Sequence, residues 1–157
     1  MANMCSNFLK ITKGKRKAFF AEIERISEIA DKTGQGQMPF GIGQDYWFDI
    51  ALDIFGHSLS YESKWNHNVE DAVNIAEKAN VEFYLSSVEF SSNLFAEFVY
   101  KDKILTYRAL DAQILDEITD DDENGWNFRG ETYCSRDELC EELLSRQPYE
   151  IFNEGAI

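Results

Sequence analysis

The chain is poor in histidine, a residue that many catalytic and metal centres use. It has two histidines, His57 and His67, and neither has a cysteine or a second histidine at zinc-ligand spacing. As general bases, the two histidines lack an obvious nucleophile partner. The glycines within 34–43 follow an expected helix rather than a strand, and no Gly-Lys-Ser/Thr accompanies them. We therefore expect a protein that binds a partner and is not an enzyme.

Cysteines and long apolar runs are also scarce. The three cysteines, Cys5, Cys134 and Cys140, are odd in number and form no CxxC pair. A disulfide framework is therefore not expected. No stretch approaches the ~18 apolar residues that a membrane span needs, and the first residues lack the apolar segment of a secretory signal. These absences favour a cytoplasmic protein without a membrane partner.

Negative charge is what the chain has in excess. Its 157 residues include 29 acids against 15 lysines and arginines, which gives a formal net charge of −14. Residues 1–18 hold five bases and no acid, whereas residues 109–157 hold 14 acids and three bases. A field of this sign repels nucleic acid and attracts basic protein surfaces. Negative charge also keeps proteins soluble, so the charge alone leaves both interpretations open.

Hydrophobic periodicity predicts an α+β domain, and the apolar share of 44% is enough for a core. Alternating stretches predict strands at residues 5–12, 58–65, 81–90, 94–100 and 103–108. One-sided apolar stripes predict helices at residues 15–32, 69–79, 109–119 and 136–146, the second capped by Asn68 and the last by Ser135. Residues 46–55 fit either a strand or a helix. In a helix, Asp45, Asp49 and Asp53 would share one face.

The order of these elements predicts helices on one face of a mainly antiparallel, ferredoxin-like sheet. Residues 1–108 are expected to form this core. Residues 109–157 are expected to form an acidic helical extension that packs on the same domain. The glycine-rich residues 34–44 are expected to form an exposed loop.

The opening residues carry a family resemblance. The stretch Ala2-Asn3-Met4-Cys5-Ser6-Asn7-Phe8-Leu9-Lys10-Ile11-Thr12 resembles the first strand of the Api92-like/YubB group of phage and plasmid proteins. The tripeptide Ser63-Lys64-Trp65 is similar to the GTKW segment of that family. The resemblance ends near residue 108. It implies a ferredoxin-like core, a mobile-element origin and a role without catalysis, and it assigns no catalytic residue.

The sharpest local motif lies at residues 120–131, DDDENGWNFRGE, which satisfy D-x-[DN]-x-[DN]-G-x5-E, the loop that wraps Ca²⁺. The expected ligands are Asp120, Asp122, Asn124, Trp126 through its backbone carbonyl, and Glu131. Asn127 and Phe128 depart from the pattern at its eighth and ninth positions. The alternative is a solvated acidic turn with Asn-Gly at its apex.

The acidic segment also predicts a protein-binding surface. We expect its carboxylates to occupy the basic, nucleic-acid-binding groove of another protein, as DNA-mimicking anti-CRISPR and anti-restriction inhibitors do. The mobile-element resemblance favours such a target. The expected contact residues are Asp116, Glu117, Asp120, Asp121, Asp122, Glu123, Glu138, Glu141 and Glu142. A calcium-binding module built on residues 120–131 is the alternative function.

Overall fold

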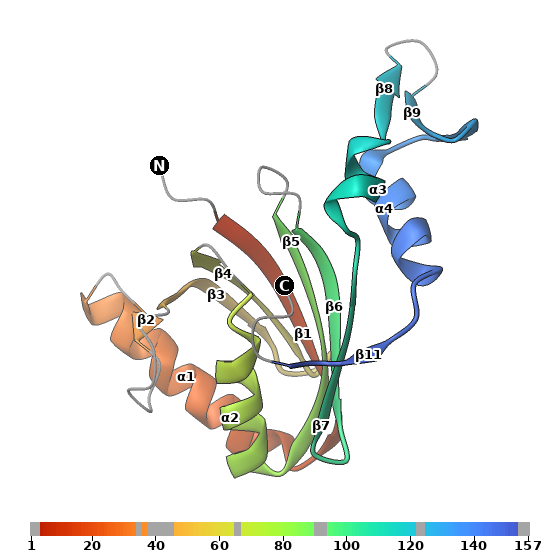
Figure 1. Ribbon diagram of the computed structural model, residues 1–157. Coiled ribbons are helices and arrows are strands. Elements are labelled where there is room, and N and C mark those ends of the chain that lie inside the picture. Colours follow the sequence, from red (N-terminus) through yellow and green to blue (C-terminus); the bar gives the residue numbers. More distant parts are fainter. Residues whose placement is uncertain are drawn as a thin grey trace.

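The computed structural model describes residues 4–33, 36–37, 46–64, 67–89, 94–121 and 125–153. Within these ranges it contains one large and one small antiparallel sheet and four helices (Figure 1). The helices are α1 (Arg16–Thr33), α2 (Val69–Ala79), α3 (Ala112–Asp116) and α4 (Arg136–Ser145). The expected α+β class with a mainly antiparallel sheet is confirmed.

The large sheet has eight strands in the order β11-β7-β6-β5-β1-β4-β3-β2, and all neighbours are antiparallel. The strands are β1 (Met4–Gly14), β2 (Gly36–Gln37), β3 (Tyr46–Asp53), β4 (Ser58–Lys64), β5 (Val81–Glu89), β6 (Leu94–Lys101), β7 (Ile104–Ala109) and β11 (Glu150–Ile151). The helix α1 leads from β1 towards β2 and β3, and α2 leads from β4 to β5, so that β1 lies between β4 and β5. Both helices lie on the same face of the sheet (Figure 1).

Alternation along the strands explains why this face is buried. In β1 and β5 every second side chain points toward the helices, and Leu9, Ile11 and Phe83 are at most 2% exposed. The apolar stripe of α1 brings Phe19 and Ile23 onto the same layer, where both are completely buried. Burying one such side chain contributes about 1.5–3 kcal/mol. The core between the two helices and the sheet is therefore the main source of stability.

Of residues 46–55, whose pattern fits either a strand or a helix, Tyr46–Asp53 form the strand β3 and the last two begin the turn that follows. Trp47 is fully buried and stacks on Tyr61 of β4, with ring centroids 3.8 Å apart. A register shift interrupts the strand beside Asp49, which has a φ of 47°. The helical row of aspartates is therefore not formed in the described residues, which do not include Asp45.

The two predicted helix caps have different outcomes. Ser135 caps α4, because its Oγ accepts a hydrogen bond of 3.1 Å from the backbone N–H of Glu138. The helix α2 begins at Val69 as predicted, but Asn68 adopts a left-handed backbone and its side chain makes no capping hydrogen bond. The N–H of Val69 instead donates to Nδ1 of His67 over 3.3 Å. The capping prediction for Asn68 was wrong.

After β7 the chain leaves the large sheet and returns to it at β11. The residues between them, 110–149, form what we call the C-terminal module, which lies beyond β6 and β7 and away from α1 and α2 (Figure 1). It contains α3, α4 and a three-stranded sheet in the order β10-β9-β8. These strands are β8 (Thr119–Asp121), β9 (Gly125–Phe128) and β10 (Glu131–Tyr133).

The expected helical extension is therefore helical only in part. The predicted helix at 109–119 shrinks to α3, and β8, β9 and β10 occupy most of the stretch between α3 and α4. The spacing of Trp126 and Phe128 explains the difference, because both pack on the apolar cluster that includes α4, as every second side chain of a strand does. In addition, β11 pairs with Thr106 and Tyr107 of β7, so the end of the segment belongs to the large sheet.

Candidate protein-binding surface

The helix α4 presents a face of carboxylates. Its apolar side, Leu139, Cys140, Leu143 and Leu144, is at most 5% exposed, which fixes the rotation of the helix. The opposite side then carries the exposed residues Asp137, Glu138, Glu141 and Glu142. Acids in the first turn also interact favourably with the helix dipole, which stabilises the end that Ser135 caps. A single rigid helix therefore displays four carboxylates within two turns.

The module is attached to the large sheet by an apolar cluster. Phe95 of β6 packs with Leu110, Leu115, Leu139 and Leu143. Because Phe95 and its neighbour Ala96, which belongs to the main core, point to opposite faces of the strand, the module contacts the face that α1 and α2 leave open. The position of α4 is therefore set by the sheet.

A hydrogen-bonded carboxylate reinforces this attachment. Glu97 of β6 accepts hydrogen bonds from Arg108 Nε at 2.6 Å, from the Tyr84 hydroxyl at 2.8 Å and from the Tyr149 hydroxyl at 3.0 Å. Arg108 also donates to the backbone carbonyl of Ser145 at the end of α4, over 3.1 Å. Burial and the neighbouring Glu97 raise the pKa of Tyr84, so its hydroxyl stays a donor. These contacts hold the end of α4 against β6 and β7.

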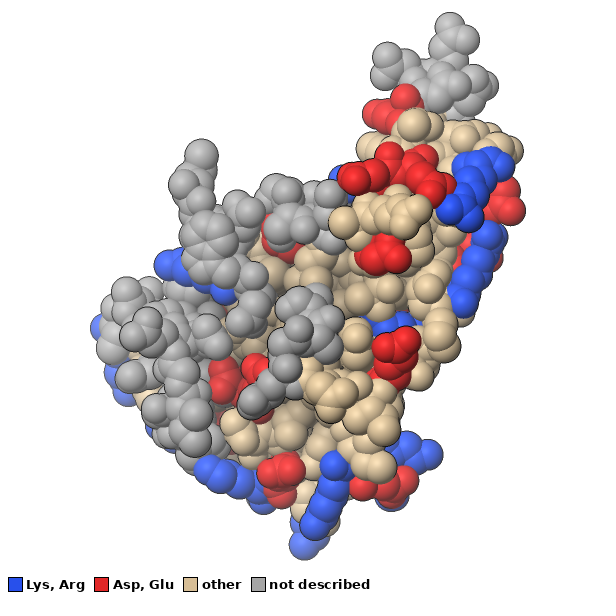
Figure 2. Space-filling model, viewed as in Figure 1, with Lys and Arg blue, Asp and Glu red and all other residues tan. Residues whose placement is uncertain are grey.

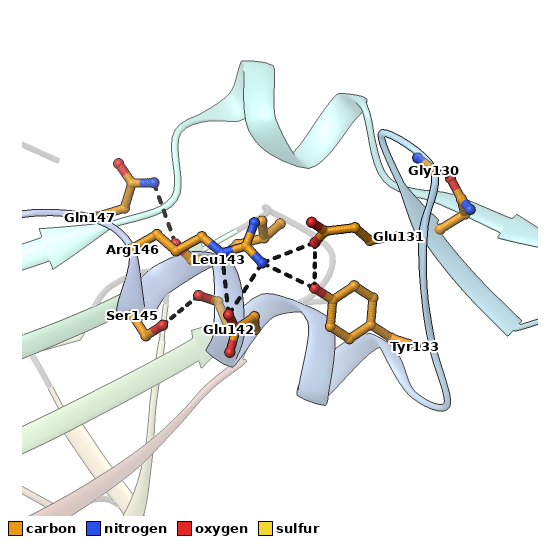
Figure 3. Close-up of polar contacts among 9 residues, drawn as sticks. Gly130, Glu131, Tyr133, Glu142, Leu143, Ser145, Arg146 and Gln147 are labelled. Atoms are coloured by element: carbon orange, nitrogen blue, oxygen red, sulfur yellow. Dashed lines mark hydrogen bonds and ion pairs between the residues drawn. The ribbon is translucent and has the colours of Figure 1, made fainter.

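Part of the module's negative charge is neutralised internally. Arg146, at the end of α4, pairs with Glu131 at 2.9 Å and with Glu142 at 3.2 Å, and Glu131 also accepts a hydrogen bond from the Tyr133 hydroxyl (Figure 3). The Tyr133 hydroxyl and Arg146 together lower the pKa of Glu131. These residues join β10 to α4 through exposed, salt-sensitive contacts.

A second pair joins the turn between β9 and β10 to the end of α3. Arg129 binds Glu117 through two hydrogen bonds of 2.5 and 2.9 Å, and this contact lowers the pKa of Glu117. In the view of Figure 2, arginines and acids of the module accordingly lie side by side. The module therefore does not present one uninterrupted field of negative charge.

The predicted contact residues divide into three sets. Glu138, Glu141 and Glu142 share the exposed face of α4, where Glu142 is bound by Arg146. Asp116 and Glu117 lie at the end of α3, and Asp120 and Asp121 lie in β8. Asp122 and Glu123 fall outside the described residues. Sequence reasoning missed Asp137, although its spacing of four residues from Glu141 places both on one side of the helix.

Among the described residues, the carboxylates of the α4 face differ in whether an arginine pairs with them. Asp137, Glu138 and Glu141 make no ion pair with any described residue, whereas Glu142 does. Asp116 and Asp120 are likewise exposed and without such a partner in this part of the chain. The α4 face is therefore the place where negative charge is both clustered and available.

Most of the described residues of the calcium motif lie in strands. Asp120 lies in β8 and pairs with Trp126 of β9, while Glu131 lies in β10, on the far side of β9. Since neighbouring strands are ~4.8 Å apart and Glu131 lies two residues along β10 from the position opposite Asp120, the Cα atoms of these two expected ligands are at least about 10 Å apart. Glu131 is also bound by Arg146. Asp122 and Asn124 lie outside the described residues.

A second set of polar side chains lies inside the large sheet, at the start of β1. The Asn7 amide donates to Ser63 Oγ at 2.7 Å and accepts from the Ser87 hydroxyl, and all three residues are at most 3% exposed. Cys5 is buried beside them, and burial, followed by the charge of Glu89, raises the pKa of its thiol to about 11. This thiol is therefore protonated at neutral pH and unsuited to nucleophilic attack.

His67 has a structural role at the start of α2. It is 8% exposed, and its ring lies 4.5 Å from that of Phe98. Burial lowers its pKa to about 4, so the ring is neutral at physiological pH and its Nδ1 is free to accept the hydrogen bond from Val69. Among the described residues, no three histidine, cysteine or acidic side chains are placed to hold a metal ion.

Comparison with known proteins returns no match. No protein-family model, no curated protein and no solved structure is similar to this chain. None of the helices in the described ranges is long and apolar enough to cross a bilayer. The function must therefore be inferred from the surface itself.

Proposed function

We propose that this chain acts without catalysis as an acidic interaction protein that binds, in the cytoplasm, a protein with a basic nucleic-acid-binding groove. The α4 face is the contact surface, and its carboxylates take the place of phosphates. The activity is inhibition of a host defence protein of the CRISPR or restriction type. The protein itself makes no direct contact with nucleic acid or membrane.

The availability of the α4 carboxylates is the observation that carries this proposal. Asp137, Glu138 and Glu141 project from one helix that is packed on the sheet, and none of them is neutralised by another described residue. Residues that successive turns of a helix place on one side lie about 5–6 Å apart, so the carboxylates form a row. A fixed row of this kind binds arginine and lysine side chains without the ordering cost that flexible acids would incur.

The proposal includes a mobile-element origin, which rests on the resemblance of residues 2–12 and 63–65 to the Api92-like/YubB group. The elements β1, α1, β3, β4, α2 and β5 follow one another in the order of a ferredoxin-like domain, with the strand order β5-β1-β4-β3. A core of this kind is what the resemblance to the Api92-like/YubB group implies. Proteins from phages and plasmids meet host defence systems, which is why a defence protein is the target we propose.

Inhibition of nucleic-acid cleavage tests the function directly. The purified chain would be titrated into cleavage reactions of a panel of CRISPR effectors and restriction endonucleases. We expect inhibition of at least one member, weakening steeply as salt is raised because the contact is electrostatic. Glu138→Lys/Glu141→Lys should abolish the inhibition.

A matched variant distinguishes the effect of the α4 face from the effect of the total charge of the chain. Glu28→Lys/Asp31→Lys changes the formal charge of −14 by the same amount, on exposed positions of α1. This control should inhibit like the wild type. Equal loss in both variants would contradict a specific role for α4, and inhibition that is insensitive to salt would contradict the electrostatic mechanism.

A further inference from the structure

The helix α1 carries its charges in the order that a helix dipole disfavours. Its first turn contains Arg16 and Lys17 and no acid, whereas cations at a helix N-terminus are destabilising. Acids follow further along, including the exposed Glu24. Neither Arg16, Lys17 nor Glu24 makes an ion pair with another described residue. These charges run against the helix dipole, and no described residue of the same chain pairs with them. We take this as an indication that a second molecule supplies the opposite charges.

The turn between β3 and β4, next to the start of α1, holds two large apolar side chains in solvent. Phe55 is 95% exposed and Ile54 is 53% exposed. The turn is nevertheless tightly built, since Asp53 accepts a 2.8 Å hydrogen bond from the N–H of Gly56. The carbonyl of Ile54 lies 3.0 Å from Nδ1 of His57. The exposure of Phe55 is therefore a fixed feature of the turn.

Glycine at position 56 leaves room for the carboxylate that closes this turn. A Cβ on Gly56 would come within 2.0 Å of the carboxylate of Asp53, the group that closes the turn. The backbone carbonyl of His57 in addition accepts from the N–H of Ile11 in β1 at 2.9 Å. The turn is thus anchored to the central strand of the sheet, and Phe55 is displayed from a rigid base.

Beside Phe55 lies a groove of about 350 Å³ that could receive a side chain of the same kind. It runs between α1 and the turn. Phe20 and Ala21 contribute apolar surface, Arg16 and Lys17 line one part of it and Glu24 lies two turns further along α1. A protruding aromatic side chain next to an apolar groove is the pairing that a self-complementary interface uses, because each copy supplies both the knob and the hole.

We propose that this surface joins two copies of the chain about a two-fold axis, with their α1 helices antiparallel. In that arrangement Arg16 and Lys17 of one copy face Glu24 of the other, and the reverse contact is made at the same time. Phe55 of each copy enters the groove of its partner. The pairing gives Arg16, Lys17 and Glu24 partners of opposite charge, and it removes the exposed ring of Phe55 from water. The proposal is independent of the function assigned to α4.

Sedimentation velocity over a wide range of protein concentration measures the association. We expect the 18.1 kDa chain to double its mass as concentration rises. Phe55→Ser should weaken the dimer roughly tenfold or more, as loss of a central aromatic anchor does. Ile151→Ser removes another exposed apolar side chain, 65% exposed in β11, and should leave the dimer unchanged.

Reversing and then exchanging the charges of α1 tests whether a second copy of the chain is the partner at this surface. Arg16→Glu places like charges opposite each other and should weaken the dimer, whereas Arg16→Glu/Glu24→Arg restores opposite charges and should recover it. A chain that stays monomeric at all concentrations overturns the proposal. So does a double variant that is as weak as the single one. A chain that stays monomeric but sediments with phosphatidylserine vesicles through Phe55 would assign the surface to a membrane instead.

Discussion

The core and the C-terminal module are stabilised in different ways. The described core joins 20 buried residues between the large sheet, α1 and α2, whereas the module's cluster joins eight. The module compensates with exposed arginine–carboxylate pairs, those of Arg129 and Arg146, which salt weakens. The large apolar core thus contains most of the buried side chains, and the smaller, charged module carries the surface that we propose binds another protein.

Core truncations should give the largest effects and would show whether the two regions unfold together. Phe83→Ala removes a completely buried ring and should lower the free energy of unfolding by about 3–5 kcal/mol, measured in urea by far-UV circular dichroism. Leu139→Ala, at an equally buried site in α4, should instead act locally. Hydrogen exchange should then accelerate in residues 110–149 only.

Acceleration throughout the core in Leu139→Ala would contradict this difference. The two regions would then form one cooperative unit, and the separation of stability from binding would not hold.

The protonation of His67 should give the next largest effect, and this contribution belongs to the core. The folded chain protonates His67 near pH 4, whereas an unfolded chain does so near pH 6.5. Between these values the unfolded state binds more protons, so the free energy of unfolding falls as the pH is lowered from 6.5 to 4, by about 3 kcal/mol in total. His67→Gln should remove this part of the slope in urea titrations, and His57→Gln, in the surface turn, should keep it.

An unchanged slope in His67→Gln would mean that the carboxylates alone cause the acid sensitivity. The neutral, hydrogen-bond-accepting ring at the start of α2 would then contribute nothing to it.

The buried hydrogen bonds of the core offer a smaller effect. Asn7→Ala deprives the Ser87 hydroxyl of its acceptor and Ser63 of a donor, and should cost about 1–3 kcal/mol in urea unfolding. Ser6→Ala, at the exposed neighbouring position, serves as the control and should change stability by no more than about 0.5 kcal/mol. Equal losses of stability in the two variants would show that the hydrogen bonds of Asn7 do not stabilise the fold.

The smallest effect concerns metal binding by the module. Because β9 separates Asp120 from Glu131 and Arg146 holds Glu131, we expect no terbium luminescence sensitised by Trp126. A signal that saturates with added Tb³⁺ and disappears in Asp120→Ala would show that residues 120–131 rearrange around an ion. It would then favour the calcium-binding alternative.

Local periodicity predicted most elements of the core. The strand at Val81 to Glu89 was predictable because every second residue in it is apolar and buried. The helix at Val69 to Ala79 was predictable because its apolar residues recur at helical spacing and face the core. The strand identity of residues 46–55 was not predictable locally, because it depends on Trp47 stacking on Tyr61, which is distant in the sequence. The cap of α2 depends on tertiary packing in the same way, since His67 acts as an acceptor only when it is buried and neutral.

The module was less predictable for a related reason. The composition of residues 109–157 shows that the segment is acidic, but it does not show which acids form ion pairs. Only the fold shows that Arg129 binds Glu117 and that Arg146 binds Glu131 and Glu142. The capping box and apolar stripe of α4 did predict which side of that helix faces solvent. The helical spacing of Asp137 and Glu141 was therefore a usable signal for the carboxylate face.

The most direct test of the central claim needs no knowledge of the partner. A short arginine-rich peptide would be titrated into the isotopically labelled protein while backbone amide shifts are followed by NMR. If α4 is the surface that recognises basic proteins, the largest shifts should centre on residues 137–142 and vanish at high salt. Shifts spread evenly over all exposed acids, or centred on residues 22–31 of α1, would contradict it.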